Sequence, residues 1–358
     1  MVKPLPSIEN RQCEVNIREN RLRDMFGKEL LGRYSDDDEM WLCAATMSSG
    51  VAPVITLNDG HLMPTLALGT GRGTAKEQDS IEEVRQAVFW ALEAGYRHID
   101  TASIYGDEEQ VGQGIADAIA KGIVKREEVF VTTKLWNDKH ACEDVVPALM
   151  ESLGRLRLDY VDLYLIHFPI ATNADGDPLN VDYLETWKGM EDAKKLGLAR
   201  SIGVSNFNAD QLSRLYQYSE IKPAVIEVEV NPTLTQHPLV DFSHRLGVAV
   251  MAFSPFGFVV SRDSGDAPPP RADDPVLVTL ANKYGKTVTQ VVLRYLVDRG
   301  LVPIPKSVNK ARLAQNINIF DFQLAPEEVA EIDKFNKNVR VIDGKGWEDY
   351  PNFPFERN

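Results

Sequence analysis

Eight short apolar segments alternate with amphipathic stretches along most of this chain, and this alternation limits the fold more than any other feature of the sequence. The apolar segments lie at 66–70, 96–100, 128–134, 159–167, 199–205, 224–230, 247–254 and 301–307. Most of them are continuously hydrophobic, which is typical of strands buried on both faces of a parallel sheet. Amphipathic stretches such as 81–95, 143–156 and 183–197 lie between them and predict helices. The pattern predicts an α/β fold, either a closed barrel or a doubly wound sheet.

The length of the chain favours the closed barrel. One (β/α)8 TIM barrel takes about 250 residues plus insertions, and no interdomain linker interrupts the middle of this 358-residue chain. Before the first apolar segment, two apolar-rich runs flank Asn58-Asp59-Gly60, and Asp-Gly supplies the positive φ of a tight hairpin turn. We therefore predict a (β/α)8 barrel that begins with a β-hairpin, in one domain at 47–358.

Residues 1–46 have a different composition from the rest of the chain. They contain seven Lys/Arg and nine Asp/Glu, with a run of four acids at 36–39. Signal and transit peptides have an apolar core or few acids. We interpret 1–46 as an N-terminal extension outside the catalytic body. Because Met47 offers a second start, an alternative or misassigned start codon explains the extension more simply than a regulatory arm.

Charge and cysteine content restrict the partners and the compartment. The formal net charge is −14 and the pI is about 5.0, which argues against a nucleic-acid surface because neutralising phosphates needs a basic stripe. No apolar run of 18 residues is present, so we expect no membrane span. Cys13, Cys43 and Cys142 lie far apart without the spacing of a metal site. We expect a cytoplasmic, metal-free protein, and any anionic ligand needs a local basic pocket.

Chemically capable side chains recur at the carboxyl ends of the predicted strands. They are Asp100, Lys134, His167, Ser205 with Asn206, Ser254, and Lys306 with Ser307. In a (β/α)8 barrel such positions converge on one mouth, where barrel active sites are built. Taken singly, each has a simpler explanation, since Asp100 would cap a helix, the lysines would be solvated, and His167 would be a core histidine. Together they predict an ion pair beside an imidazole in one cleft.

This set of side chains suits proton donation to a carbonyl oxygen. Tyr105 follows Asp100 closely enough to reach the same cleft, and a nearby ammonium lowers the pKa of a tyrosine. Lys134 would supply that ammonium, Asp100 would hold it charged, and His167 would hydrogen-bond the substrate oxygen. None of these residues can supply a hydride. We therefore expect a cofactor.

A phosphate site is predicted near the end of the chain. Gly69, Gly71 and Gly73 lack the G-x-G-x-x-G spacing of a Rossmann site. Residues 304–316 instead combine Lys306, Ser307, Asn309 and Arg312 at a strand end and the start of a helix, an arrangement that favours a dianion. This local basic region in an acidic protein indicates the 2′-phosphate of NADPH. The alternative is a surface loop with two ordinary charges.

Five ordered motifs resemble the signatures of the aldo-keto reductases. They are "HIDTASIYGDEEQVG", "TKLW", "LIHFP", "SIGVSNF" and "IPKS" followed by Arg312 and Gln315-Asn316. The resemblance runs from about Val54 to the C-terminus. Taken as a whole, the sequence most resembles insect, lepidopteran members of the family, including those similar to 3-dehydroecdysone 3β-reductases. It implies a barrel closed below by the hairpin, NADPH across the mouth, and a catalytic tetrad of Asp100, Tyr105, Lys134 and His167.

The resemblance also implies the cofactor contacts. They are Gly69, Thr70, Asp100, Ser205, Asn206, Glu227, Phe253, Ser254, Phe256, Lys306, Ser307, Val308, Asn309, Arg312, Gln315 and Asn316. Within this set Ser205 and Asn206 would meet the nicotinamide amide, and Asn316 the adenine. Glu227 stands where a glutamine usually contacts the carboxamide, and it can donate a hydrogen bond only when protonated. Phe253 stands where a tyrosine usually stacks on the nicotinamide ring, and a phenyl ring can stack in the same way.

Further departures from the family pattern concern the adenine site, the Tyr105 loop and the substrate pocket. Gln315 stands where relatives usually have a glutamate near the adenine. Asp107 stands where they have an asparagine after the tyrosine. The pocket would consist of Gly71, Tyr105, Trp136, His167, Phe168 and Trp347, with Gly71 and Phe168 where many relatives carry tryptophan. A roomier pocket under an aromatic C-terminal substrate loop favours a flat, bulky ketone such as 3-dehydroecdysone. The alternatives are a general aldehyde or aldose reductase and a non-catalytic NADPH-binding protein. For any of these we expect a monomer that binds small molecules.

Overall fold

The computed structural model describes residues 51–71, 81–260 and 268–356. The predicted extension at 1–46 and the domain start at Met47 lie outside the described residues.

Eight parallel strands form the barrel. They are β3 (Leu68–Gly69), β4 (His98–Asp100), β5 (Phe130–Leu135), β6 (Val161–Ile166), β9 (Ala199–Ser205), β10 (Val225–Glu229), β11 (Ala249–Phe253) and β12 (Val302–Ile304). Each pairs with its neighbours in the order β12-β11-β10-β9-β6-β5-β4-β3. A parallel bridge joins Gly69 to Lys306, and the Gly69 N–H donates to the Pro305 carbonyl at 3.1 Å. These bonds link the first strand to the last and close the barrel predicted from the sequence.

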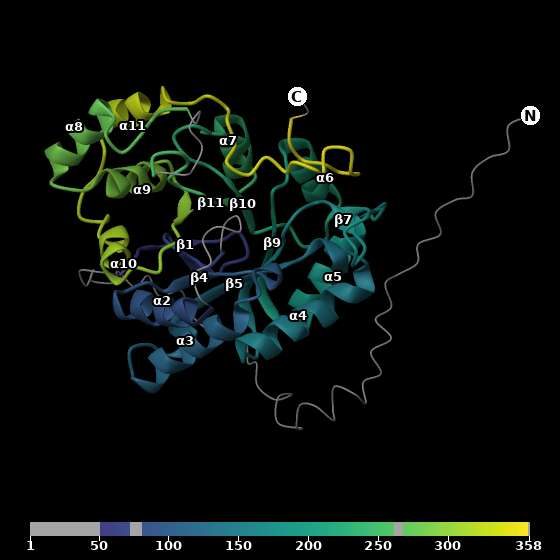
Figure 1. Cartoon of the computed structure of the whole chain (residues 1–358). Helices are drawn as coiled ribbons and strands as arrows, with labels where there is room; N and C mark the ends of the chain where they lie inside the picture. The colour runs from purple at the N-terminus through teal and green to yellow at the C-terminus, as the bar shows by residue number, and fades with distance from the viewer. Residues whose placement is uncertain (1–50, 72–80, 261–267, 357–358) are drawn as a thin grey trace, which may run out of the picture. The chain divides into compact units, whose positions relative to one another are not determined.

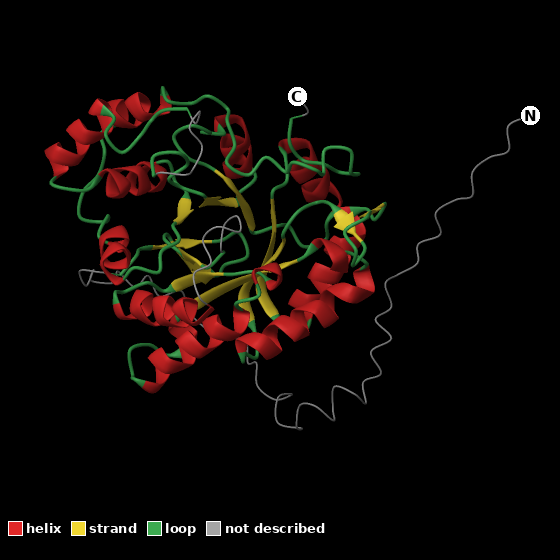
Figure 2. Cartoon of the chain, viewed as in Figure 1, coloured by secondary structure: helices red, strands yellow, loops and turns green. Residues whose placement is uncertain are grey.

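Helices surround this ring of strands (Figures 1 and 2). They are α2 (Ile81–Glu93), α3 (Glu108–Ala120), α4 (Cys142–Leu156), α5 (Tyr183–Lys195), α6 (Ala209–Tyr218), α7 (His237–Arg245), α8 (Pro275–Tyr284), α9 (Val288–Asp298), α10 (Lys310–Ile317) and α11 (Pro326–Asp333). Several begin at a side-chain cap: Asn208 and Gln211 form a reciprocal capping box at α6, and Thr287 and Gln290 do so at α9. The amphipathic stretches at 81–95, 143–156 and 183–197 correspond to α2, α4 and α5.

The predicted hairpin closes the amino-terminal end of the barrel. β1 (Val54–Thr56) pairs antiparallel with β2 (Leu62–Pro64), and Gly60 adopts φ 87° in the turn. The hairpin's Leu57 and Met63 are buried in a cluster with barrel residues, including the first residues of β5, β10 and β12. Burying each of these two side chains is worth about 1.5–3 kcal/mol. The hairpin therefore fills the end of the barrel opposite the predicted site.

The residues after α11 run without regular structure toward α6, in yellow in Figure 1. Two side chains of the α6 capping box hold this segment. Asn208 Nδ2 donates to the Pro354 carbonyl at 3.1 Å, and Gln211 Nε2 donates to the Asn352 carbonyl at 2.8 Å. A short hairpin of β7 (Ala171–Thr172) and β8 (Pro178–Leu179) follows β6, and Tyr350 of the C-terminal segment donates to its Gly176 carbonyl at 3.1 Å.

Candidate active site

The predicted ion pair lies at the carboxyl ends of β4 and β5. Lys134 Nζ is 2.6 Å from Asp100 Oδ1 and donates to the Thr101 carbonyl at 3.2 Å. Both charged side chains are buried, with 0% and 4% of their surface exposed. Burial alone would lower the pKa of Lys134, but the charges of Asp100 and Glu227 more than offset it and hold that pKa above its usual range. Lys134 is therefore a permanent cation.

Tyr105 is held over this pair by a short loop after β4. It ends the 3-10 helix η1 (Ser103–Tyr105), and Ser103 Oγ donates to the Lys134 carbonyl at 3.0 Å. The Lys134 ammonium lies 5.4 Å from the centre of the Tyr105 ring. Burial raises the pKa of Tyr105, Lys134 opposes that shift, and Asp100 and Glu227 add to it. Lys134 thus acts in the expected direction, but the net shift in this structure is upward.

His167 follows β6 and faces the Tyr105 ring edge-on, with 5.6 Å between the ring centres. It is buried, and burial together with the Lys134 charge holds its pKa well below the usual range. His167 is therefore neutral. In the described part of the chain its Nδ1 has no hydrogen-bond partner, while the carbonyl of the same residue accepts from Asn206 Nδ2 at 2.9 Å. A neutral imidazole can donate a hydrogen bond to a ligand oxygen.

Glu227 joins the ion pair from the far side of the barrel, on β10. Its Oε1 lies 3.3 Å from Lys134 Nζ, and the side chain is 3% exposed. Beside it, Ser205 and Asn206 are buried at the end of β9, and Asn206 adopts φ 61°. Asn206 Oδ1 is a buried acceptor without a partner among the described residues. Glu227, Ser205 and Asn206 are the residues at which the family resemblance implies contacts with the nicotinamide amide.

The predicted phosphate residues gather at the start of α10. Asn309 caps this helix by accepting from the Arg312 N–H at 3.1 Å. The Asn309 N–H donates to Ser307 Oγ, also at 3.1 Å. Arg312 is exposed, and Lys306 lies next to the Gly69 bridge that closes the barrel.

The remaining predicted cofactor positions lie close to these. Thr70 and Asn316 are buried, Gln315 is exposed, and Phe253, Ser254, Phe256 and Val308 are half-buried at the ends of β11 and β12.

Aromatic side chains cover the mouth beside His167. Trp136 lies 5.2 Å from the His167 ring, and Phe168 stacks on the same ring at 5.5 Å. Trp347 of the C-terminal segment contacts both, at 6.0 Å from Trp136 and 5.2 Å from Phe168 between ring centres. Phe355 joins this cluster, with 6.4 Å between the centres of the Phe355 and Phe168 rings. A Cβ on Gly71 would lie 3.0 Å from Tyr105 Cζ, so Gly71 packs closely against the Tyr105 ring and leaves little room there for a side chain.

Sequence reasoning assigns no contact to two acidic residues near the site. Glu229, 1% exposed, accepts the backbone N–H groups of Val341 at 2.7 Å and Ile342 at 2.9 Å, which ties the C-terminal segment to β10. Asp107 accepts from the hydroxyls of Thr70 and Thr101. The only signal for Glu229 was the second acid inside an otherwise apolar strand. For Asp107 the only signal is its departure from the family pattern, which does not identify a partner.

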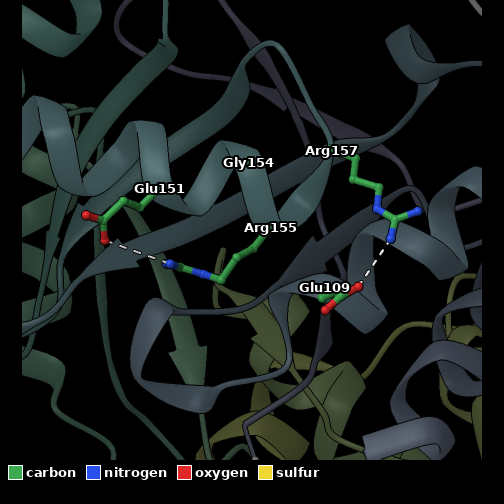
Figure 3. Close-up of a pocket in the computed structure, with 5 residues that line it drawn as sticks. All are labelled: Glu109, Glu151, Gly154, Arg155 and Arg157. Atoms are coloured by element: carbon green, nitrogen blue, oxygen red, sulfur yellow. Dashed lines mark hydrogen bonds and ion pairs between the residues drawn. The ribbon is translucent and has the colours of Figure 1, made fainter.

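A shallow charged pocket on the outside of the barrel is separate from this site (Figure 3). It lies between α3 and α4, and ion pairs join its walls: Arg157 to Glu109 at 3.1 Å and Arg155 to Glu151 at 3.9 Å. Because its arginines already face carboxylates, it offers no unpaired cation to a ligand.

The described residues contain no cluster of three or more His, Cys, Asp or Glu suited to a metal ion. Among the same residues, no helix has both the length and the hydrophobicity of a membrane span.

Comparison with known proteins agrees with the geometry. The model of the Aldo/keto reductase family matches residues 65–337. The chain belongs to this family. Aldo-keto reductase AKR2E4 of Bombyx mori is 70% identical over 303 residues, which cover 85% of this chain and 98% of that protein. Aldo-keto reductase family 1 member A1 of Mus musculus is 41% identical over 81% of this chain and 91% of its own length.

Solved structures show the same fold. The crystal structure of Bombyx mori AKR2E4 in complex with NADP has a TM-score of 0.84 and covers 85% of this chain and 99% of its own. A crystal structure of AKR2E5 complexed with NADPH is 44% identical, has a TM-score of 0.83, and covers 85% and 94%. The predicted family, its lepidopteran resemblance, the (β/α)8 fold and the oxidoreductase class are confirmed.

Proposed function

We propose that this protein reduces carbonyl compounds to alcohols with NADPH, and that Asp100, Tyr105, Lys134 and His167 are its catalytic residues. The observation that carries the proposal is the buried Lys134–Asp100 pair beneath the Tyr105 ring, with neutral His167 against the ring edge. A structural or regulatory protein of the same fold has no physical need for a buried ion pair beneath a tyrosine, because burying charges is costly.

The side chains at the mouth fit NADPH. Asn206 Oδ1 and the second oxygen of Glu227 are buried polar atoms without a partner in the described part of the chain, so they suit a carboxamide. The capped start of α10, with Lys306 and Arg312, suits the 2′-phosphate. When bound, NADPH supplies the hydride that reduces the carbonyl carbon. The bound structures of AKR2E4 with NADP and AKR2E5 with NADPH support this cofactor.

The chain's own residues orient the substrate and supply the proton. His167 donates a hydrogen bond to the carbonyl oxygen, which fixes the carbon for attack. Tyr105 transfers its hydroxyl proton to that oxygen as negative charge develops there, and solvent later returns a proton to the phenolate. Lys134 stabilises the transient phenolate, and Asp100 keeps the ammonium aimed at it.

Tyr105→Phe tests this mechanism. It removes the proton donor and keeps the ring, so we expect kcat to fall by about 10²–10⁴-fold while NADPH binding, measured by quenching of protein fluorescence, is retained. His167→Phe is a useful companion, because it should impair substrate orientation without removing the donor. Near-normal turnover of Tyr105→Phe would exclude Tyr105 as the acid.

We further propose a steroid-type ketone such as 3-dehydroecdysone as the substrate. Trp136, Phe168 and Trp347 offer flat apolar faces, and about 100 Å² of additional apolar contact is worth roughly 2.5 kcal/mol before ordering costs. A small aldose buries too little surface to use these faces. A general aldehyde or aldose reductase is the competing function.

A comparison of substrates separates the two functions. We expect kcat/KM, followed by NADPH oxidation, to be higher for the ketone than for xylose or glyceraldehyde, and we expect Trp347→Ala to remove most of that difference. If aldoses are preferred by the intact enzyme, the ketone assignment is wrong and carbonyl reduction stands. We also propose a monomeric, cytoplasmic enzyme; light scattering of the purified protein tests the first point and imaging of a tagged chain the second.

A further inference from the structure

Three ionisable side chains form one buried cluster at the centre of the mouth. Asp100 on β4, Lys134 on β5 and Glu227 on β10 are 3%, 0% and 2% exposed. Lys134 Nζ lies 2.6 Å from Asp100 and 3.3 Å from Glu227. The second oxygen of each carboxyl, Asp100 Oδ2 and Glu227 Oε2, is buried and accepts no hydrogen bond from the described residues. Two carboxyl groups therefore share one ammonium.

Among the residues that the structure describes, those around Glu227 add no second positive charge. Opposite Glu227, the paired positions on β9 and β11 are Ser205 and Met251, which are uncharged. The charges that act on the Glu227 carboxyl come from Asp100 and Lys134. Tyr105 also faces the cluster and is neutral below its raised pKa.

The two histidines that face Lys134 are neutral as well. Burial lowers the pKa of His98 on β4 to about 3 and that of His167 well below its usual range. With both carboxyls ionised, the cluster would hold a net charge of −1 in a site shielded from water.

Such a charge is costly, because an unpaired ion loses several kcal/mol of solvation when buried. Two carboxyl groups that compete for one site avoid that cost by binding a single proton between them. Asp100 is the closer to the ammonium, so its ionised form is better stabilised. Burial first, and then the Asp100 charge, raises the pKa of Glu227 well above its usual range. The proton therefore resides on Glu227.

We propose that Asp100 and Glu227 hold one proton between them in the free enzyme, and that this proton is released when an oxidised nicotinamide binds but kept when a reduced one binds. The second half rests on the proposed function, under which the nicotinamide lies beside Ser205, Asn206 and Glu227. An oxidised nicotinamide ring is positively charged, and a nearby positive charge favours the ionised carboxylate. A reduced ring is neutral and leaves the carboxylic acid intact, free to donate a hydrogen bond.

The release couples pH to the choice of dinucleotide. Because NADP+ binding releases a proton, raising the pH favours NADP+ over NADPH, by at most tenfold per pH unit for one proton. Glu227 is in this sense a charge-regulating residue. Its neutral form also spares Tyr105 a negative neighbour in addition to Asp100 and Asp107, since ionised Glu227 raises the pKa of Tyr105 and weakens it as an acid.

The protein without dinucleotide tests the shared proton. A carboxyl with a raised pKa in the folded state contributes stability that is present below its unfolded pKa of about 4.3 and is lost as the pH rises through the folded pKa. Glu227→Gln removes this loss. We therefore expect the Tm of Glu227→Gln to gain on wild type as the pH is raised from about 5 to 8, whereas Glu348→Gln, which removes an exposed carboxylate, controls for net charge. A Tm difference that does not change with pH would overturn the shared proton.

Calorimetry in buffers of different ionisation enthalpy tests the release. In wild type we expect NADP+ binding to release up to one proton more than NADPH binding, and in Glu227→Gln we expect the two counts to be equal. Equal counts in wild type, with both dinucleotides bound, would overturn the release and leave the reductase function standing. If neither dinucleotide binds, the proposed function fails together with the release, and the Tm series still decides the shared proton.

Discussion

Removing the central cation should destabilise the protein far more than removing an equivalent cation near its surface. In Lys134→Met, Asp100 and Glu227 lose the ammonium that both contact, at 2.6 and 3.3 Å, inside a site with almost no exposure. Removing one partner of a buried pair costs about 3–5 kcal/mol. For a domain of this size each kcal/mol shifts Tm by roughly 2–4 °C, so we expect a loss on the order of 10 °C.

The matched control is Lys310→Met. Lys310 contacts Glu93 at the same distance of 2.6 Å, but the two side chains are 59% and 44% exposed. Solvent screens such a pair, so we expect a loss of at most about 1 kcal/mol. Thermal and urea unfolding of the two variants measures the contrast. If Lys134→Met is no less stable than Lys310→Met, the buried cluster does not have the energetics described above.

The pH adds a second check on the same variant. Without Lys134 the two carboxyls retain raised pKa values from burial and lose the charge that opposed the shift. Their contribution to stability is then lost as the pH rises through those values. The deficit of Lys134→Met relative to wild type should therefore grow between about pH 5 and 8, and Lys134→Met/Glu227→Gln should recover part of it. A deficit that is constant with pH would contradict the argument.

Three other predictions concern the phosphate site, the extension and the helix layer. Arg312→Ala should weaken NADPH far more than NADH in fluorescence titrations, because only NADPH carries the 2′-phosphate; an equal loss for both would place the phosphate elsewhere. A chain that begins at Met47 should fold and reduce carbonyls as the full chain does, and loss of soluble protein would reverse that view. Gly112→Ala places a Cβ 2.1 Å from the Leu156 carbonyl and should cost about 3 kcal/mol or more, whereas Gly154→Ala meets nothing within 4 Å and should be neutral or stabilising in urea unfolding.

The sequence predicted best what depends on local pattern. The strands and helices of the barrel can be predicted from the spacing of their hydrophobic residues. The gathering of polar residues at one end of the barrel can be predicted because the carboxyl ends of all its parallel strands lie there. Helix ends depend less on local pattern: Gly154, a residue type that favours helix ends, lies inside α4, and the helix is capped by Arg157 at φ 57°. The preference for glycine at a helix end is thus not followed at α4.

Contacts across the barrel could not be predicted from the sequence, and the two acidic residues of β10 show why. Side chains two residues apart on a strand point to the same face, so Glu227 and Glu229 share a face but lie at different heights in the barrel. The first contacts Lys134, and the second accepts the N–H groups of Val341 and Ile342. Neither partner is a neighbour of β10 in the sequence, and both contacts depend on the closed curvature of the sheet. A single strand thus contributes to both the charge cluster, to which we assign the shared proton, and the anchoring of the C-terminal segment, which we propose to cover the substrate; displacing β10 should therefore disturb proton linkage and substrate choice together.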